Sequence, residues 1–196
     1  MNNENKTFFV IPGFKTQAKD RQYKWLVKFL EDKGIKVIKT PVFWNYKTLS
    51  ENAEEFVGFF NKNKTKENYI LGFSYGAVIA LLTASLLNPK KIYLCSLSPD
   101  FSEDRSLMES SIKKYIGKKR YVDTKTRSGR KIAQELFVPA VIFYGEKEGK
   151  EYPQLKKRCE ETARLAKNSK LIVVKNSPHQ IDFPLYVEAI KNTLDF

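Results

Sequence analysis

Residues 69–87 read YILGFSYGAVIALLTASLL, and this stretch decides the fold. Its first five residues are apolar and of the types that strands prefer. Its last thirteen are apolar on nearly every side and are followed by an Asn-Pro pair, which predicts a buried helix that ends there. Gly72 and Gly76 flank Ser74 at the junction, so we expect the chain to turn sharply from strand to helix at this serine.

The alternation of strand and helix extends along the rest of the chain. Short apolar runs predict strands at residues 7–11, 35–40, 69–73, 92–97, 140–144 and 171–175. Patterns of helical period lie at residues 20–33, 50–62, 75–87, 153–167 and 184–194. Such alternation predicts an α/β fold, a three-layer sandwich in which about six mainly parallel strands carry helices on both faces.

One connection interrupts this alternation. Residues 99–136 are polar and basic, with weak helical character only around residues 106–116. No repeat or interdomain linker is visible elsewhere in the sequence. We therefore expect a single domain over residues 1–196, with residues 99–136 as a short basic insertion between the fourth and fifth strands.

The composition is strongly basic, with 35 Lys and Arg against 22 Asp and Glu and a formal net charge of +13. Residues 113–131 hold nine of these cations and a single acid, Asp123. A basic surface attracts nucleic acid, anionic lipid or an acidic substrate. Lysines are nevertheless spread over nearly every predicted helix, and no nucleic-acid-reading motif is present. Nucleic acid is therefore not an expected partner, and the oligomeric state stays open.

Other features limit the class of protein further. No run approaches 18 apolar residues, so we expect no membrane span. The first residues lack the pattern of a signal peptide, which favours a cytoplasmic location. The chain has one histidine, and its two cysteines, Cys95 and Cys159, are far apart in sequence, so neither a metal nor a cofactor is expected.

Ser74 is the candidate nucleophile of an enzyme. A serine hydroxyl is a weak nucleophile and needs an adjacent base and a site that stabilises negative charge. The turn predicted at Ser74 exposes its hydroxyl beside the free N–H groups of a helix N-terminus. His179, the only histidine, follows the last predicted strand, and loops at the carboxyl ends of parallel strands are where such folds place their sites. We expect His179 to be the base.

With these features the sequence resembles the α/β-hydrolase superfamily over nearly its whole length, through the strand–helix order, the G-x-S-x-G turn and the chain order serine, acid, histidine. The resemblance implies an acid three residues after the glycine that ends the fifth strand, which is Glu148. The superfamily more often has aspartate at this place. Glu146, in the same turn, and Asp100, after the fourth strand, remain alternatives for the acid.

The resemblance also implies an oxyanion hole of two backbone N–H groups, from Tyr75 and Phe14. Where the superfamily often has His-Gly before the second donor, this sequence has Pro12 and Gly13. Few residues precede the first strand, so we expect a reduced version of the fold, with only the basic insertion at the position of a lid.

These features together predict a serine hydrolase of carboxylesterase type, cleaving a small ester through a Ser74–Glu148–His179 triad and an acyl-enzyme intermediate. The expected partner is a small-molecule acyl substrate, and the basic charge suggests an anionic acyl or leaving group. A thioesterase, amidase or acyltransferase would share the triad. A non-catalytic module of the same fold, binding through its basic surface, is the alternative outside enzymes.

Overall fold

The computed structural model describes residues 5–195. The expected absence of a signal peptide concerns residues 1–4 in part, and these lie outside the described residues. Within residues 5–195 six parallel strands form one sheet, in the order β2-β1-β3-β4-β5-β6. The strands are β1 Lys6–Ile11, β2 Lys36–Lys39, β3 Glu67–Phe73, β4 Lys91–Cys95, β5 Ala140–Gly145 and β6 Ser169–Val174.

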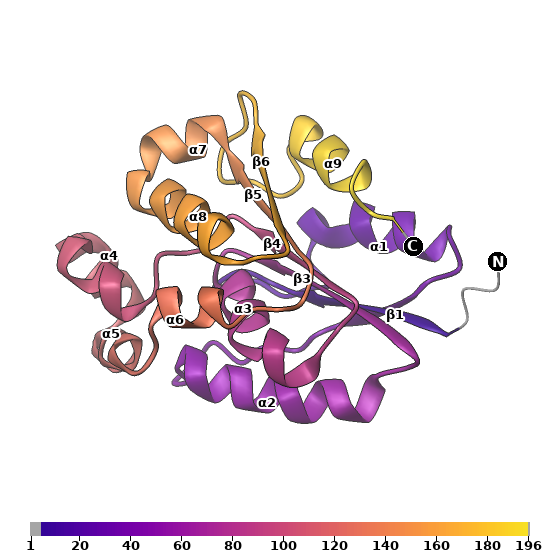
Figure 1. The fold of residues 1–196 in the computed structure, drawn as a ribbon, viewed down its shortest axis with the longest axis horizontal. Coiled ribbons are helices and arrows are strands. Elements are labelled where there is room, and N and C mark those ends of the chain that lie inside the picture. The colour runs from indigo at the N-terminus through magenta and orange to yellow at the C-terminus, as the bar shows by residue number, and fades with distance from the viewer. Residues whose placement is uncertain (1–4, 196) are drawn as a thin grey trace.

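Helices cover both faces of the sheet, in the three layers visible in Figure 1. One face packs against α1 (Lys24–Glu31) and α9 (Pro184–Lys191), through buried side chains such as Leu26 and Ile190. The other face packs against α2 (Leu49–Asn63), α3 (Tyr75–Leu87) and α8 (Pro153–Leu165). Alternate residues of each strand therefore enter opposite cores, which explains why the strands read as continuous apolar runs. The predicted fold class is confirmed.

The predicted elements agree with the structure except at particular boundaries. β6 begins two residues before the predicted range 171–175, and β4 ends at Cys95, two residues before the predicted range 92–97 does. The side of α9 that faces the core includes Tyr186, which is fully buried, and not Leu185, which is 42% exposed. A helix, α7 (Glu146–Glu151), replaces the charged turn expected after β5.

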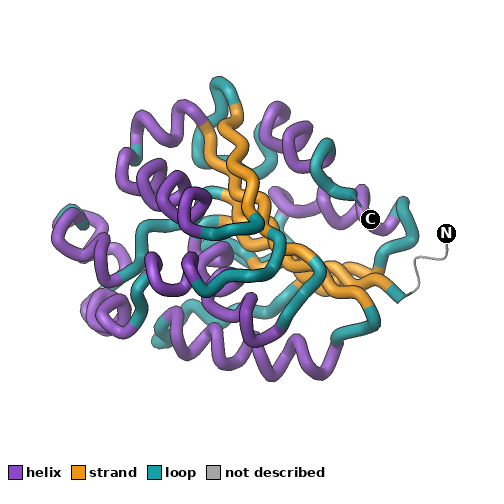
Figure 2. Tube along the Cα trace, viewed as in Figure 1, coloured by secondary structure: helices purple, strands orange, loops and turns teal. Residues whose placement is uncertain are grey.

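The insertion is more helical than its sequence suggests (Figure 2). Beyond the weak helix expected around residues 106–116, it forms several short helical turns. They are η2 Ser102–Leu107, α4 Ser110–Ile116, α5 Lys118–Asp123, η3 Thr124–Thr126 and α6 Gly129–Gln134. Within the insertion Arg127 binds the Asp100 carboxylate, and the insertion is held to the body by Arg158 of α8, which lies 2.6 Å from the carboxylate of Asp104. Figure 1 shows α4 and α5 at the opposite end of the molecule from the N-terminus.

Candidate active site

Ser74 occupies the single-residue turn between β3 and α3. Its backbone has φ 56° and ψ −117°, a conformation that residues other than glycine rarely adopt. A Cβ at Gly72 would lie 2.2 Å from the carbonyl oxygen of Gly76, and one at Gly76 would lie 2.3 Å from that of Ile11. Both glycines are therefore required for the turn to close against β1. The turn has the geometry expected of a strained nucleophile elbow.

The Ser74 side chain has a polar neighbour that the sequence did not suggest. Its Oγ lies 3.1 Å from Oγ of Ser98, which follows β4. Within residues 5–195 no hydrogen bond joins Ser74 to His179. His179 nevertheless lies near this turn. The centroid of its ring is 4.9 Å from that of Phe73, the residue before Ser74. The imidazole thus lies beside the elbow, while the serine hydroxyl is turned toward Ser98.

Glu148 and His179 are brought together. The Glu148 Oε1 atom is hydrogen-bonded to His179 Nδ1, and the Glu148 side chain is fully buried. The other carboxylate oxygen accepts from the Ser96 hydroxyl at 3.0 Å and from the Gly145 N–H at 2.7 Å. Ser96 in turn lies 2.9 Å from the hydroxyl of Tyr186. These contacts give both oxygens of a buried carboxylate partners and orient it toward the imidazole.

The two alternative acids lie elsewhere. Asp100 is buried and paired with Arg127, and burial, which outweighs the attraction of Arg127, raises the pKa of Asp100 to about 6. Glu146 accepts from the N–H of Asn176 at 3.1 Å and pairs with Lys150 at 3.2 Å. These two contacts lower the pKa of Glu146, the N–H of Asn176 having the larger effect. Neither carboxylate is hydrogen-bonded to His179 among the described residues.

Phe14 and Tyr75 lie next to one another, with ring centroids 5.2 Å apart. The preceding loop is fixed by Tyr23, whose hydroxyl accepts from the Gly13 N–H at 2.9 Å. A Cβ at Gly13 would lie 3.5 Å from Cβ of Ser74, so this loop passes close to the elbow. Among the backbone hydrogen bonds of residues 5–195, neither the Phe14 N–H nor the Tyr75 N–H has an acceptor. Two donors beside Ser74 are therefore available to a ligand.

Aromatic side chains pack on Phe14, and a cavity whose lining includes two lysines lies next to them. Trp44 packs edge-on against Phe14 with centroids 5.5 Å apart, and Tyr115 of α4 does so at 5.3 Å. A cavity of about 500 Å³ lies alongside, lined by Lys15, Gln17, Val42, Phe43, Trp44, Asn45 and Lys47. Ser74, Glu148 and His179 do not line it, so it is a compartment next to these three candidate residues.

Three residues of this site were not found from the sequence. Ser96 and Ser98, in the segment after β4, and Tyr186 of α9 contribute hydroxyls to it across long sequence separations. The run SLSP, directly after a buried strand, was the one available signal, because it places hydroxyls at the carboxyl end of the sheet. Within residues 5–195 no group of three or more His, Cys, Asp or Glu side chains is arranged to hold a metal ion. In the same residues no helix is long and apolar enough to cross a membrane.

No family model matches the sequence, and no curated protein matches it. Solved structures do resemble the chain. The esterase Est1E of Butyrivibrio proteoclasticus, solved with ferulic acid bound, superposes with a TM-score of 0.79 at 16% identity, over 98% of this chain and 90% of that one. The esterase Pf2001 of Pyrococcus furiosus gives 0.70 at 18% identity, over 98% and 81% of the two chains.

An esterase of Exiguobacterium antarcticum gives a TM-score of 0.70 at 14% identity, over 96% of this chain and 90% of that one. At such identities the likeness concerns the fold. The resemblance drawn from the sequence is confirmed at that level, since the chain has the α/β-hydrolase fold in a reduced form with a six-stranded parallel sheet.

Proposed function

We propose that this chain is a serine hydrolase that cleaves a small ester by way of an acyl-enzyme, with Ser74 as nucleophile, His179 as base and Glu148 as the orienting acid. The observation that carries the proposal is the pairing of the buried Glu148 carboxylate with Nδ1 of His179, next to a strained serine turn. Resemblance in fold to several esterases supports the same reaction class.

The reaction begins with the proton on Nδ1 of His179 directed to Glu148, which leaves Nε2 free to accept. The Ser74 side chain rotates away from Ser98, gives its proton to Nε2, and its Oγ bonds to the ester carbonyl carbon. The carbonyl oxygen becomes an oxyanion, held by the N–H groups of Phe14 and Tyr75. The buried Glu148 carboxylate stabilises the imidazolium formed at this stage.

The intermediate then collapses. The bond between the carbonyl carbon and the ester oxygen breaks, and His179 returns its proton to the departing alcohol. Water attacks the acyl-enzyme, passing a proton to Nε2, and the acid is released as that proton returns to Ser74 Oγ. Each step uses only this chain's own residues and water.

The alternative of a binding module with a basic surface receives less support. Several cations of residues 113–131 are used inside the molecule. Lys119 pairs with Glu51 at 2.7 Å, Arg130 pairs with Glu161 at 2.8 Å, and Arg127 is buried. The insertion therefore offers fewer free cations than its sequence suggests. A thioesterase or amidase would use the same three residues, and an ester is the substrate class that we propose.

The proposal is tested with the Ser74→Ala variant. Hydrolysis of 4-nitrophenyl hexanoate is expected to fall by about 10⁴-fold or more while the circular dichroism spectrum is retained. Ser85→Ala, on the exposed side of the same helix, serves as the matched control and should keep its activity. Hydrolysis that persists unchanged in Ser74→Ala would refute the assignment.

A further inference from the structure

Two cations flank the aromatic ring of Phe14, the proposed oxyanion residue. The guanidinium carbon of Arg120 lies 4.9 Å from the centroid of this ring, and Nζ of Lys15 lies 5.3 Å from it. Lys15 also lies 4.3 Å from the centroid of Tyr115. The Phe14 ring also contacts that of Tyr75, the residue after Ser74. The Phe14 ring therefore lies between both cations and the turn that carries Ser74.

Neither cation has a carboxylate partner among residues 5–195. Arg120 donates to the backbone carbonyls of Ile116 and Trp44, and its buried Nε has no hydrogen-bond partner. Lys47, the other cation lining the neighbouring cavity, is by contrast neutralised by Glu55. A partly buried guanidinium without a counter-charge is costly, and an anion placed beside it is bound with little competition from the protein's own carboxylates.

The neighbouring cavity has the size and chemistry of a ligand compartment. Its volume of about 500 Å³ is lined by the apolar side chains of Val42, Phe43 and Trp44 and by the polar ones of Lys15, Gln17, Asn45 and Lys47. Lys15 and Tyr46 both have left-handed backbones, at φ 61° and 62°. Non-glycine residues are held in this conformation chiefly where surrounding structure imposes it, often at ligand sites.

The position of His179 indicates which part of the substrate Lys15 and Arg120 would contact. The leaving oxygen must lie at His179 to receive its proton, and the rings packed on this histidine are those of Phe73 and Tyr152. Phe14 is instead one of the proposed oxyanion donors, and Lys15 and Arg120 lie on its ring. They therefore face the group attached to the carbonyl carbon, which is the acyl part of the substrate.

We infer that the chain is selective for esters whose acyl chain ends in an anion such as a carboxylate, with Lys15 and Arg120 binding the charge and Phe43 and Trp44 contacting the apolar part of the chain. This inference rests on the proposed function.

Two substrates that differ in one group test it: 4-nitrophenyl hexanoate and the mono-4-nitrophenyl ester of adipic acid, in which a carboxylate replaces the terminal methyl. The ratio of their kcat/KM values is expected to favour the adipate about tenfold, and to fall when salt is added, because a partly exposed ion pair is screened. Lys15→Met and Arg120→Gln should each lower the ratio by about three- to tenfold.

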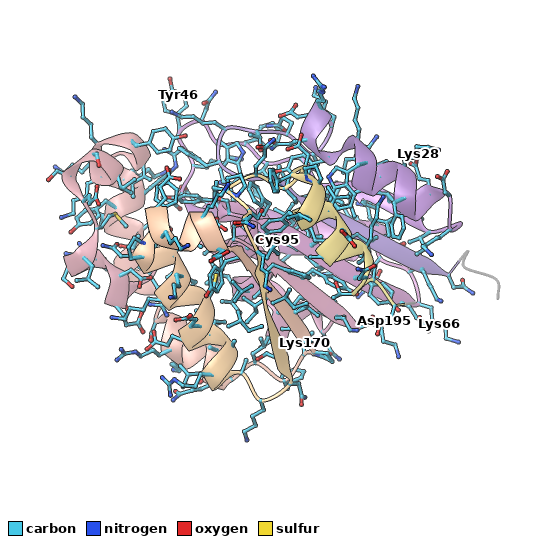
Figure 3. All side chains as sticks on the ribbon, turned by 90° about the horizontal axis from the view of Figure 1, so that it is seen from above. Lys28, Tyr46, Lys66, Cys95, Lys170 and Asp195 are labelled. Carbon is cyan, nitrogen blue, oxygen red and sulfur yellow. The ribbon has the colours of Figure 1, made fainter. Side chains whose placement is uncertain are left out.

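Lys170→Met is the charge-matched control and should leave the ratio unchanged. Lys170 lies in β6, far from Tyr46 in Figure 3. A wild-type ratio at or below one, or a ratio that neither variant lowers, would overturn the inference and leave the proposed function standing. If neither ester is hydrolysed above the buffer rate, the proposed function fails, and the inference fails with it.

Discussion

The hydroxyl oxygens of Ser74 and Ser98 lie 3.1 Å apart, within hydrogen-bond distance. Ser98 is thus a hydrogen-bond neighbour of the proposed nucleophile, and within residues 5–195 no hydrogen bond joins Ser74 to the imidazole of His179. Rotation of Ser74 between staggered χ1 wells would transfer its hydroxyl from one partner to the other. A hydroxyl at Ser98 can also donate to Ser74 Oγ once Ser74 itself donates to His179.

We predict that Ser98→Ala lowers kcat/KM by about two- to tenfold, because a neutral hydrogen bond contributes about 0.5–1.5 kcal/mol. Ser98→Thr retains a hydroxyl and is expected to restore most of the rate. Steady-state kinetics on 4-nitrophenyl hexanoate measure both variants. A loss beyond about a thousandfold in Ser98→Ala would instead indicate that Ser98 is the nucleophile.

Replacing Glu148 distinguishes the acid from its neighbours. Glu148→Gln keeps the shape of the side chain but removes the charge that stabilises the His179 imidazolium, so kcat is expected to fall about 10³- to 10⁴-fold. Glu146→Gln, two residues earlier in the same helix, is the matched control and should remain within about twofold of wild type. The reverse order of these two effects would assign the acid to Glu146.

The two glycines of the elbow should tolerate no side chain. Gly72→Ala is predicted to destabilise the protein by about 3 kcal/mol, since its Cβ would overlap the backbone of Gly76. Gly58→Ala is the control, because Gly58 lies exposed inside α2 with no atom within 4 Å of the added Cβ. There alanine should stabilise by about 0.5–1 kcal/mol. Urea unfolding measures both, and equal effects would contradict the geometry described.

The insertion should contribute to acid sensitivity through Glu103, whose carboxylate accepts from the N–H groups of Gly129 and Arg130 at 3.1 and 3.2 Å. Burial by itself raises the pKa of Glu103, but hydrogen bonds, first among them that from Ser128, outweigh it and lower the pKa to about 2. The unfolded chain, with the ordinary value of 4.5, therefore binds more protons between these pH values, and stability rises with pH there.

The stabilisation from Glu103 is thus complete above about pH 4.5 and is lost as the pH falls toward 2. In Glu103→Gln the free energy of unfolding should depend less steeply on pH across this window. Urea titrations at several pH values give the slope. Parallel slopes for the variant and the unmodified chain would show that these hydrogen bonds do not favour the charged carboxylate.

The parts of the fold that the sequence predicted are those determined by short-range patterns. The elbow has a local signature in residues 72–76, and apolar runs covered on both faces identify parallel strands without knowledge of their partners. Beyond the weak helix expected around residues 106–116, the helical turns of the insertion were missed because each is too short to show an apolar stripe. Buried ion pairs, Arg127 with Asp100 within the insertion and Arg158 of α8 with Asp104, hold them in place.

The same distinction applies to the candidate site. Ser74 and His179 were proposed from their positions after strands, and Glu148 was proposed, ahead of Glu146 and Asp100, from the spacing that the α/β-hydrolase resemblance implies. Ser98 contacts Ser74 across 24 residues, and Tyr186 contacts Ser96 across 90, so neither contact leaves a local pattern. Helix α7 was read as a turn because its residues, EKEGKE, are charged and contain a glycine, whereas a buried hydrogen bond between Glu148 and the N–H of Gly145 fixes its first turn.

The central claim is that Ser74 is an activated nucleophile, and its covalent labelling tests this most directly. The folded protein is treated with a fluorophosphonate, digested, and analysed by mass spectrometry. We predict one adduct, on the peptide that contains Ser74, in the unmodified chain and in Ser98→Ala, and none in Ser74→Ala. A folded protein that takes up no label, or a Ser74→Ala variant labelled as fully as the unmodified chain, would contradict the assignment.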